Sequence, residues 1–122
     1  MFQGAAEQAV TFYVSLFARS DVRLVERWKP GVPGREGSFK RAEFTVAGRD
    51  IIALDSPVKH DFTFTPAISL FVECESEKEL DGVYAKLSEG GQVFMPLDNY
   101  GFSRKFGWVN DRYGVSWQLN WG

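Results

Sequence analysis

The order of elements in this chain is decided by residues 67–121, which read AISLFVECESEKELDGVYAKLSEGGQVFMPLDNYGFSRKFGWVNDRYGVSWQLNW. Residues 67–73 have the alternation typical of a strand. Ser76 and Glu79 then form a capping-box pattern, and Gly90-Gly91 supplies a helix stop. Between the capping box and the helix stop, four apolar residues recur at helical spacing: Leu80, Val83, Tyr84 and Leu87. Three more strands are predicted over residues 92–97, 104–110 and 115–121.

The first half of the chain repeats this order. A helix is predicted from Ala5 to Phe17, and a long loop from Lys29 to Gly37. The strands of this half are predicted over residues 21–28, 38–46 and 49–55, the last two joined by a turn at Ala47-Gly48. Only Met1-Phe2-Gln3 precedes Gly4, so the strand before the first helix is either a stub or begins earlier. The chain is interpreted as one α+β domain, residues 1–122, made of two βαβββ modules at about 1–56 and 66–122.

Composition favours a compact domain without nucleic-acid or membrane partners. The 122 residues are 44% hydrophobic and 16% aromatic, which is enough for a core. A formal net charge of −2 leaves no basic patch for nucleic acid. No apolar run reaches membrane-spanning length, and no secretory leader is recognisable. The single cysteine, Cys74, cannot form an internal disulfide, so we expect a buried thiol and a cytoplasmic protein.

Several motifs carry a resemblance to a known family. They are the segments 2–7, 53–57, 100–103 and 106–119, the last of which contains Asp-Arg-Tyr-Gly before the final strand. Together with the repeat, they resemble the vicinal oxygen chelate superfamily of glyoxalases, bleomycin-resistance proteins and extradiol dioxygenases, and more narrowly its PhnB-like branch. That branch often carries the label 3-demethylubiquinone-9 3-methyltransferase. The residues do not support this activity, because no parallel α/β unit with a glycine-rich turn is visible.

The resemblance implies that the sheets curl into a cup with the helices outside. Alternation along the strands then predicts which side chains face the cup. Ile68, Leu70, Val72, Trp117, Leu119 and Trp121 are expected on the helix side, as are Ile52 and Leu54, whereas Ile51, Ala53, Ala67 and Asn120 are expected in the cup. The predicted ligand-binding residues are Asp55, Ser69, Phe71, Glu73, Trp108, Asn110, Ser116 and Gln118.

The enzymes of this superfamily hold a divalent metal with His and Glu side chains that line the cup. The positions that can be read here fall on Ala53, Ala67 and Gln118, and the fourth would lie before Met1. Alanine has no ligand atom, and an amide is a poor substitute for a carboxylate. We therefore expect no metal and no cofactor.

Other polar residues allow two interpretations each. His60 can be a general base oriented by Asp61, or an exposed loop residue, which we favour. Asp55-Ser56 can bind a ligand at the cup rim or simply begin a turn before Pro57. The four cations of the third strands, Lys40, Arg41, Arg104 and Lys105, are expected to be solvated rather than to form an anion-binding rim.

The sequence thus predicts a metal-free, homodimeric protein that binds a small organic molecule in its cup. One alternative is a metal-dependent lyase, isomerase or dioxygenase-like enzyme. Another is a resistance protein that sequesters a drug. The identity of the ligand is not readable from the sequence.

Overall fold

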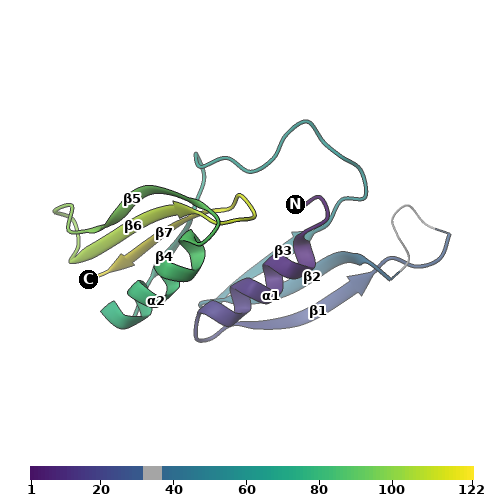
Figure 1. Cartoon of the computed structure of the whole chain (residues 1–122). Helices are drawn as coiled ribbons and strands as arrows, with labels where there is room; N and C mark the ends of the chain where they lie inside the picture. Colours follow the sequence, from purple (N-terminus) through teal and green to yellow (C-terminus); the bar gives the residue numbers. More distant parts are fainter. Residues whose placement is uncertain (32–36) are drawn as a thin grey trace. The chain divides into compact units, whose positions relative to one another are not determined.

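The computed structural model describes residues 1–31 and 37–122 (Figure 1). The middle of the predicted 29–37 loop, residues 32–36, lies outside the described residues. The chain divides into two compact units, Met1–Phe62 and Thr63–Gly122, and each is described by itself. No helix in the described part of the chain is long and apolar enough to cross a membrane.

The first unit places one helix on a three-stranded antiparallel sheet. Its elements are α1 (Ala6–Leu16), β1 (Asp21–Arg27), β2 (Phe39–Val46) and β3 (Arg49–Leu54), with strand order β1-β2-β3. Phe2 forms a single parallel bridge with Asp55 beyond the end of β3. In the described residues, the strand before α1 is therefore a one-residue bridge.

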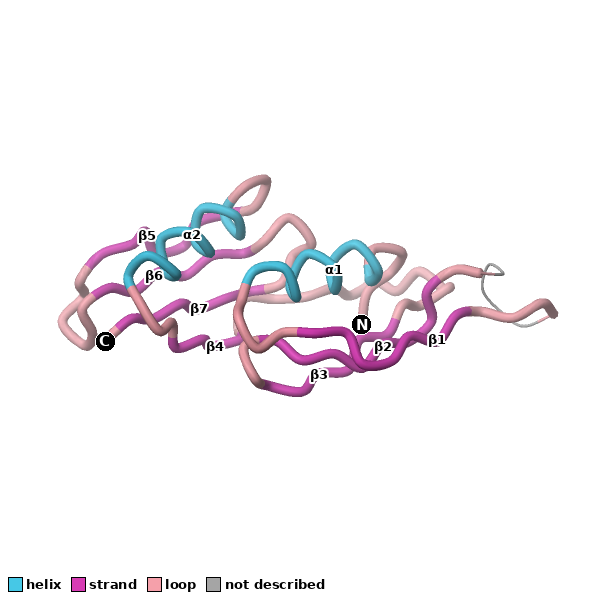
Figure 2. Tube along the Cα trace, turned by 90° about the horizontal axis from the view of Figure 1, so that it is seen from below, coloured by secondary structure: helices cyan, strands magenta, loops and turns pink. Residues whose placement is uncertain are grey.

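The second unit has the same plan with its first strand complete. Its elements are β4 (Leu70–Glu73), α2 (Glu77–Ser88), β5 (Gln92–Asp98), β6 (Lys105–Asn110) and β7 (Ser116–Trp121). The strand order is β4-β7-β6-β5, and β4 runs parallel to β7 as Phe2 does to the end of β3. In both units the helix covers one face of its own sheet (Figure 2). The predicted α+β fold with a βαβββ repeat is confirmed.

The local signals behave as the sequence predicts. Ser76 Oγ accepts a hydrogen bond from Glu79 N at 3.1 Å, and Gly90 ends α2 with a φ of +72°. The Glu79 carboxylate accepts from Glu75 N, one residue before the cap. Between β2 and β3, Ala47 and Gly48 both have positive φ, as a two-residue hairpin turn requires.

The core of each unit lies between its helix and its sheet. In the first unit Ala9, Val10 and Tyr13 of α1 are buried over β2, whose inward side chains are Ala42, Phe44 and Val46. In the second unit Leu80, Val83 and Leu87 of α2 are buried over Val109, Trp117 and Leu119. Gly107 allows this close approach, because a Cβ there would lie 3.0 Å from the Tyr84 ring and 2.8 Å from Leu97.

The predicted facing of β3 is wrong. Ile52 and Leu54 are 56% and 45% exposed, whereas Ala53 is buried at 4%. Alternation therefore puts Ile51, Ala53 and Asp55 on the helix side. The register explains this facing: Ala53 pairs with Ala42 and Ile51 pairs with Phe44, and both of these β2 residues are buried under α1, so Ile52 and Leu54 fall on the opposite face.

Two details of the predicted strand 67–73 also need correction. β4 begins only at Leu70, so Ala67 and Ile68 precede it, and Ile68 is 80% exposed instead of packed on the helix. The facing of β7 and of the rest of β4 is as expected, with Val72, Trp117 and Leu119 buried on the helix side.

Candidate functional site

The face of the second sheet that α2 does not cover, called here the open face, is organised in three rows across β4, β7 and β6. The middle row is Phe71, Gln118 and Trp108, which are paired across the strands. One neighbouring row is Glu73, Asn120 and Phe106, and the other contains Ser116 and Asn110, with Ser69 beside Ser116. Seven of the eight predicted ligand-binding residues therefore lie on one face of one sheet, as strand alternation predicts.

Gln118 occupies the centre of the open face. It is half-buried, and its side-chain amide has no hydrogen-bond partner among the described residues. Its cross-strand neighbours are two aromatic residues, of which Phe71 is 53% exposed. A partly buried amide between aromatic rings offers both a donor and an acceptor in apolar surroundings, the usual character of a small-molecule site.

The serine row fixes the indole of Trp108. Ser116 Oγ lies 2.7 Å from Ser69 Oγ and accepts a hydrogen bond of 2.8 Å from Trp108 Nε1. The ring of Phe94 contacts the indole at a centroid distance of 5.0 Å. Trp108 is therefore held in one orientation with its polar atom satisfied, and its remaining apolar surface belongs to the half-buried open face.

The opposite row holds a carboxylate. Asn120 is 7% exposed and donates from Nδ2 to both oxygens of Glu73, at 3.1 and 3.0 Å. Glu73 itself is exposed, and it forms no ion pair with the Lys and Arg side chains of the described residues. The buried amide therefore orients a negative charge that no cation of the described residues neutralises.

Phe106, in the same row as Glu73, belongs to a group of four rings, Phe71, Tyr100, Phe102 and Phe106, which we call the aromatic cluster. Phe106 is buried and lies 5.0 Å from Phe102, 6.2 Å from Tyr100 and 6.3 Å from Phe71, centroid to centroid. The other three rings are exposed. Loss of hydration, with a smaller contribution from the charge of Asp98, raises the pKa of the Tyr100 phenol.

Sequence reasoning missed three members of the aromatic cluster and gave Asn120 no role. Phe106 alternates with Trp108 along β6, so the same alternation could have found it. Tyr100 and Phe102 lie in the turn between β5 and β6, and no periodicity applies to a turn.

The eighth predicted residue, Asp55, lies in the first unit and has a different role. Its carboxylate accepts hydrogen bonds from Gly4 N and from Ala6 N, the latter at 3.3 Å, at the start of α1. The N-cap residue, Ala5, has no side-chain oxygen, so a residue 49 positions away satisfies the first turn. Asp55 also lines a cavity of about 630 Å³ together with Gln3, Glu7, Trp28 and Ser56.

His60 is part of a small loop network in this unit. Its Nε2 lies 2.9 Å from Ser56 Oγ, and its backbone N–H donates to Gln3 Oε1 at 2.8 Å. Ser56 Oγ also donates to Val58 O, which is the geometry of a turn. The pair of His60 with Asp61 that would make a general base is not formed by these contacts; the ring meets Ser56 and stacks on Phe62 instead.

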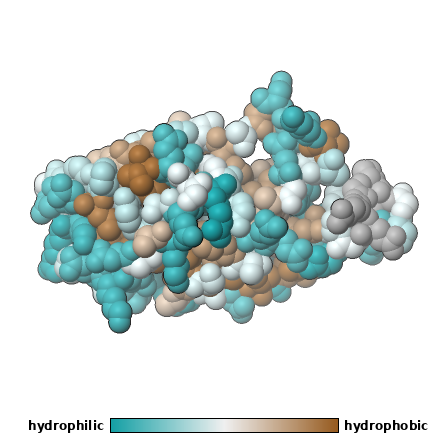
Figure 3. Space-filling model, viewed as in Figure 1, coloured by the Kyte–Doolittle hydropathy of each residue, from teal (hydrophilic) through white to brown (hydrophobic). Residues whose placement is uncertain are grey.

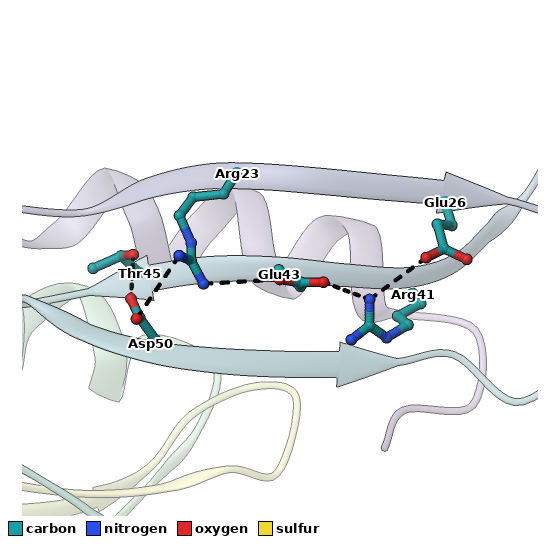
Figure 4. A network of polar contacts seen from close by, with 6 residues as sticks. All are labelled: Arg23, Glu26, Arg41, Glu43, Thr45 and Asp50. Carbon is teal, nitrogen blue, oxygen red and sulfur yellow. Dashed lines mark hydrogen bonds and ion pairs between the residues drawn. The ribbon is translucent and has the colours of Figure 1, made fainter.

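The first sheet also has a face that α1 does not cover. The polar side chains on this face form ion pairs and hydrogen bonds with one another. Arg41 contacts Glu43 at 2.7 Å and Glu26 at 3.5 Å, and Arg23 lies within 4 Å of Glu43 and Asp50. Figure 4 shows this network running across the three strands, with Thr45 bonded to Asp50. Apolar side chains remain exposed beside the network, because Glu43 and Arg41 are paired with Ile52 and Leu54.

The four cations considered as an anion-binding rim each have a local partner. Lys40 lies over the Trp28 ring, Arg104 lies over the Trp121 ring, and Lys105 is paired with Asp81 at 2.7 Å and Glu77 at 3.3 Å. Arg41 belongs to the network of Figure 4. These contacts spread the charges over both units, so the rim is not formed within either unit.

Cys74 is buried, as expected, and burial raises the pKa of its thiol to about 12, with the charges of Glu79 and Glu73 adding to the shift. At neutral pH the side chain is therefore a protonated thiol. A thiol with such a pKa is a poor nucleophile at neutral pH.

The residues at the superfamily's metal positions do not fit a divalent cation. Ala53 is buried on the helix side of β3, and its neighbours on the other face, Ile52 and Leu54, have no ligand atoms. In the second unit the corresponding residues are Ala67 and the neutral amide of Gln118. No group of three or more His, Cys, Asp or Glu side chains suited to a metal occurs within residues 1–31 and 37–122.

Comparison with known proteins places this fold and site in a family. The profile of the family described as 3-demethylubiquinone-9 3-methyltransferase matches residues 1–120. The chain belongs to this family. The predicted resemblance to the PhnB-like branch of the vicinal oxygen chelate superfamily is thereby confirmed.

Two solved structures support the assignment. A PhnB protein from Bacillus cereus is 51% identical, with a TM-score of 0.95 over 100% of this chain and 95% of that chain. Protein PA1353 from Pseudomonas aeruginosa is 25% identical, with a TM-score of 0.82 over 98% of this chain and 91% of that chain. A search among curated proteins finds no match. The structural neighbours agree with a fold of the vicinal oxygen chelate type.

Proposed function

We propose that this member of the family is a metal-free protein that binds a small organic molecule on the open face of its second unit. The observation that carries the proposal is the position of Gln118: its amide has no hydrogen-bond partner among the described residues and lies between Phe71 and Trp108. An amide that stabilises neither the core nor a neighbouring side chain is available to a ligand. The adjacent rings supply the apolar contact area that such ligands need.

The family name implies methyl transfer, which the described residues do not support. A methyltransferase that uses S-adenosylmethionine needs a glycine-rich turn between a strand and a helix to approach the cofactor. The strand-to-helix connection here is Cys74-Glu75-Ser76, which has no glycine, and β4 and β7 form the one parallel strand pair of the named sheets in the described chain. We therefore do not assign this activity to the chain.

The binding site can be tested with benzyl alcohol, a neutral aromatic probe with one hydroxyl group. Saturation-transfer NMR should detect binding to the wild type. Gln118→Ala should weaken it about fivefold, the effect of one lost hydrogen bond. Gln8→Ala, an exposed glutamine of α1, is the matched control and should bind like the wild type. Equal binding by all three proteins would refute the proposed site.

Metal independence separates this proposal from a glyoxalase-like lyase or isomerase. Protein purified without chelator should contain well below one equivalent of zinc, nickel, manganese or iron by elemental analysis. A stoichiometric metal that is lost in a Gln118→Ala variant would support the metal enzyme instead. A drug-sequestering protein would be distinguished by much tighter binding of a large planar drug than of benzyl alcohol.

A homodimer is part of the proposal. Both units expose large apolar side chains, including Leu54, Ile68 and Phe102, and apolar and hydrophilic residues are interspersed on the surface seen in Figure 3. Strands β1 and β5 end their sheets with unpaired edges, which pairing with a second chain would protect. Light scattering should give about twice the 13.8 kDa of one chain. A monomer at all micromolar concentrations would contradict the proposed homodimer.

The proposal also includes a cytoplasmic location, which is based on the single buried cysteine.

A further inference from the structure

Resting on the proposed binding at the open face, we infer that its preferred ligands carry an organic ammonium group, which Glu73 and the aromatic cluster receive. The first observation is the state of the carboxylate. Asn120 donates to both Glu73 oxygens from a side chain that is 93% buried, so the carboxylate is oriented before any ligand arrives. Oriented groups lose less freedom on binding, and this increases affinity.

The second observation is the lack of a counter-charge. None of the Lys and Arg side chains of the described second unit forms an ion pair with Glu73. Lys105 is paired with acidic residues of α2, Arg104 lies over Trp121 and Arg112 lies over Tyr113. The remaining two, Lys78 and Lys86, are exposed residues of α2, which covers the opposite face of the sheet. Asp98, paired with Phe106 across β5 and β6, adds a second carboxylate at this end of the sheet. The end of the open face that holds the rings is therefore negative.

The third observation is the composition of the surroundings. Phe71 precedes Glu73 by two residues on the same face of β4, and its ring contacts Phe106, which lies in the same row as Glu73. Tyr100 and Phe102 extend the cluster with exposed rings. Aromatic faces attract cations through their quadrupole, and quaternary ammonium groups are bound by such rings because their charge is spread over methyl groups. An anionic ligand would be repelled by the same groups.

The polar residues of the other rows complete the description of the ligand class. Gln118 lies about two strand positions from Glu73 along the rows, and its amide can bond a hydroxyl or carbonyl group of the same molecule. The site therefore favours a molecule with a cationic head and a polar group a few bonds away. Simple hydrocarbons lack both features.

Two probes of the same shape test the role of the charge: choline, a quaternary ammonium alcohol, and 3,3-dimethylbutan-1-ol, in which carbon replaces the nitrogen. Titrations followed by the NMR signals of the Asn120 and Gln118 side-chain amides should show choline binding about fivefold tighter or more. Glu73→Gln should abolish this preference while leaving the neutral alcohol unchanged. Glu89→Gln, the same charge change at the end of α2, should keep it.

The outcomes separate this inference from the proposed function. Equal binding of the two probes, or a choline preference that survives Glu73→Gln, overturns the ammonium inference, and benzyl alcohol binding then still supports an open-face site. If none of the three probes binds, both proposals fail. Shifts that follow protein concentration instead of probe concentration would assign the aromatic cluster to contact between chains and would also overturn the inference.

Discussion

The two units of this protein share one topology but have opposite chemistry on the sheet faces that their helices leave uncovered. In the first unit, charged side chains of β1, β2 and β3 pair with one another across the sheet (Figure 4). In the second unit, the uncovered face presents aromatic rings, the Gln118 amide and the Glu73 carboxylate of β4, and among the described residues the amide has no hydrogen-bond partner and the carboxylate has no ion-pair partner. The shared topology therefore determines which face of each sheet is left uncovered. The residues on that face determine whether its polar groups pair with one another or remain available to a ligand.

The largest expected effect concerns the boundary between core and open face in the second unit. Trp117 is fully buried, and its Nε1 donates to Asp111 Oδ2 at 2.9 Å. Trp117→Ala should lower the free energy of unfolding by about 3 to 5 kcal/mol, because it leaves a cavity and removes one hydrogen bond from the buried Asp111 carboxylate. Gln118→Ala, at the next position, should change it little. Urea denaturation of the two variants checks this, and the reverse order would exchange the two faces of β7.

The start of α1 distinguishes the first unit from the second. Asp55→Ala should cost about 1 to 2 kcal/mol of unfolding free energy, because both backbone N–H groups it accepts from lose their partner and a negative charge leaves the helix start. Asp50→Ala is the control, because Asp50 is exposed and bonds only within the surface network. Thermal unfolding should show a clear loss for the first variant alone. Similar losses in both would mean that Asp55 does not cap the helix.

The start of α2 is capped locally and should be somewhat less sensitive. Ser76→Ala removes the acceptor of Glu79 N and should cost about 1 kcal/mol. Ser88→Ala removes a hydroxyl that bonds to the Tyr84 carbonyl at the other end of the helix, where no donor is left unsatisfied. Chemical denaturation should therefore rank Ser76→Ala below Ser88→Ala in stability. The opposite ranking would contradict the capping role of Ser76.

The smallest effect is expected on the charged face of the first unit. Arg23 is about half exposed and lies 3.8 to 3.9 Å from its two acidic partners. Arg23→Ala should change stability by less than about 0.5 kcal/mol, because water and salt screen such pairs. The measurement is denaturation in low and high salt. A loss above 2 kcal/mol that disappears in high salt would show that the network is a major source of stability.

Much of this fold is readable from the sequence because its signals are local. The capping box at Ser76, the stop at Gly90 and the hairpin turn at Ala47-Gly48 depend on neighbouring residues alone. In the second unit the alternation of β7 also predicts the open face, since Trp117 and Leu119 are both large and apolar and Gln118 is not.

The errors arise where the decision is not local. On β3, Ile52 and Leu54 point outward because Ile51 and Ala53 pair with β2 residues that are buried under α1, and alternation alone does not reveal which of the two sets faces the helix. The role of Asp55 depends on a contact 49 residues away with a helix start that lacks its own cap. The aromatic cluster draws Tyr100 and Phe102 from a turn, and Glu73 gains its orientation from Asn120 on another strand.

One measurement tests the contrast between the two faces most directly. Backbone amide shifts of the whole protein are recorded by NMR while benzyl alcohol is added. We predict that the largest shifts fall on residues 71, 108 and 118 of the open face, and that residues 43, 45 and 52 of the charged face move little. Shifts centred on residues 43–52, or equal shifts on both faces, would contradict the account.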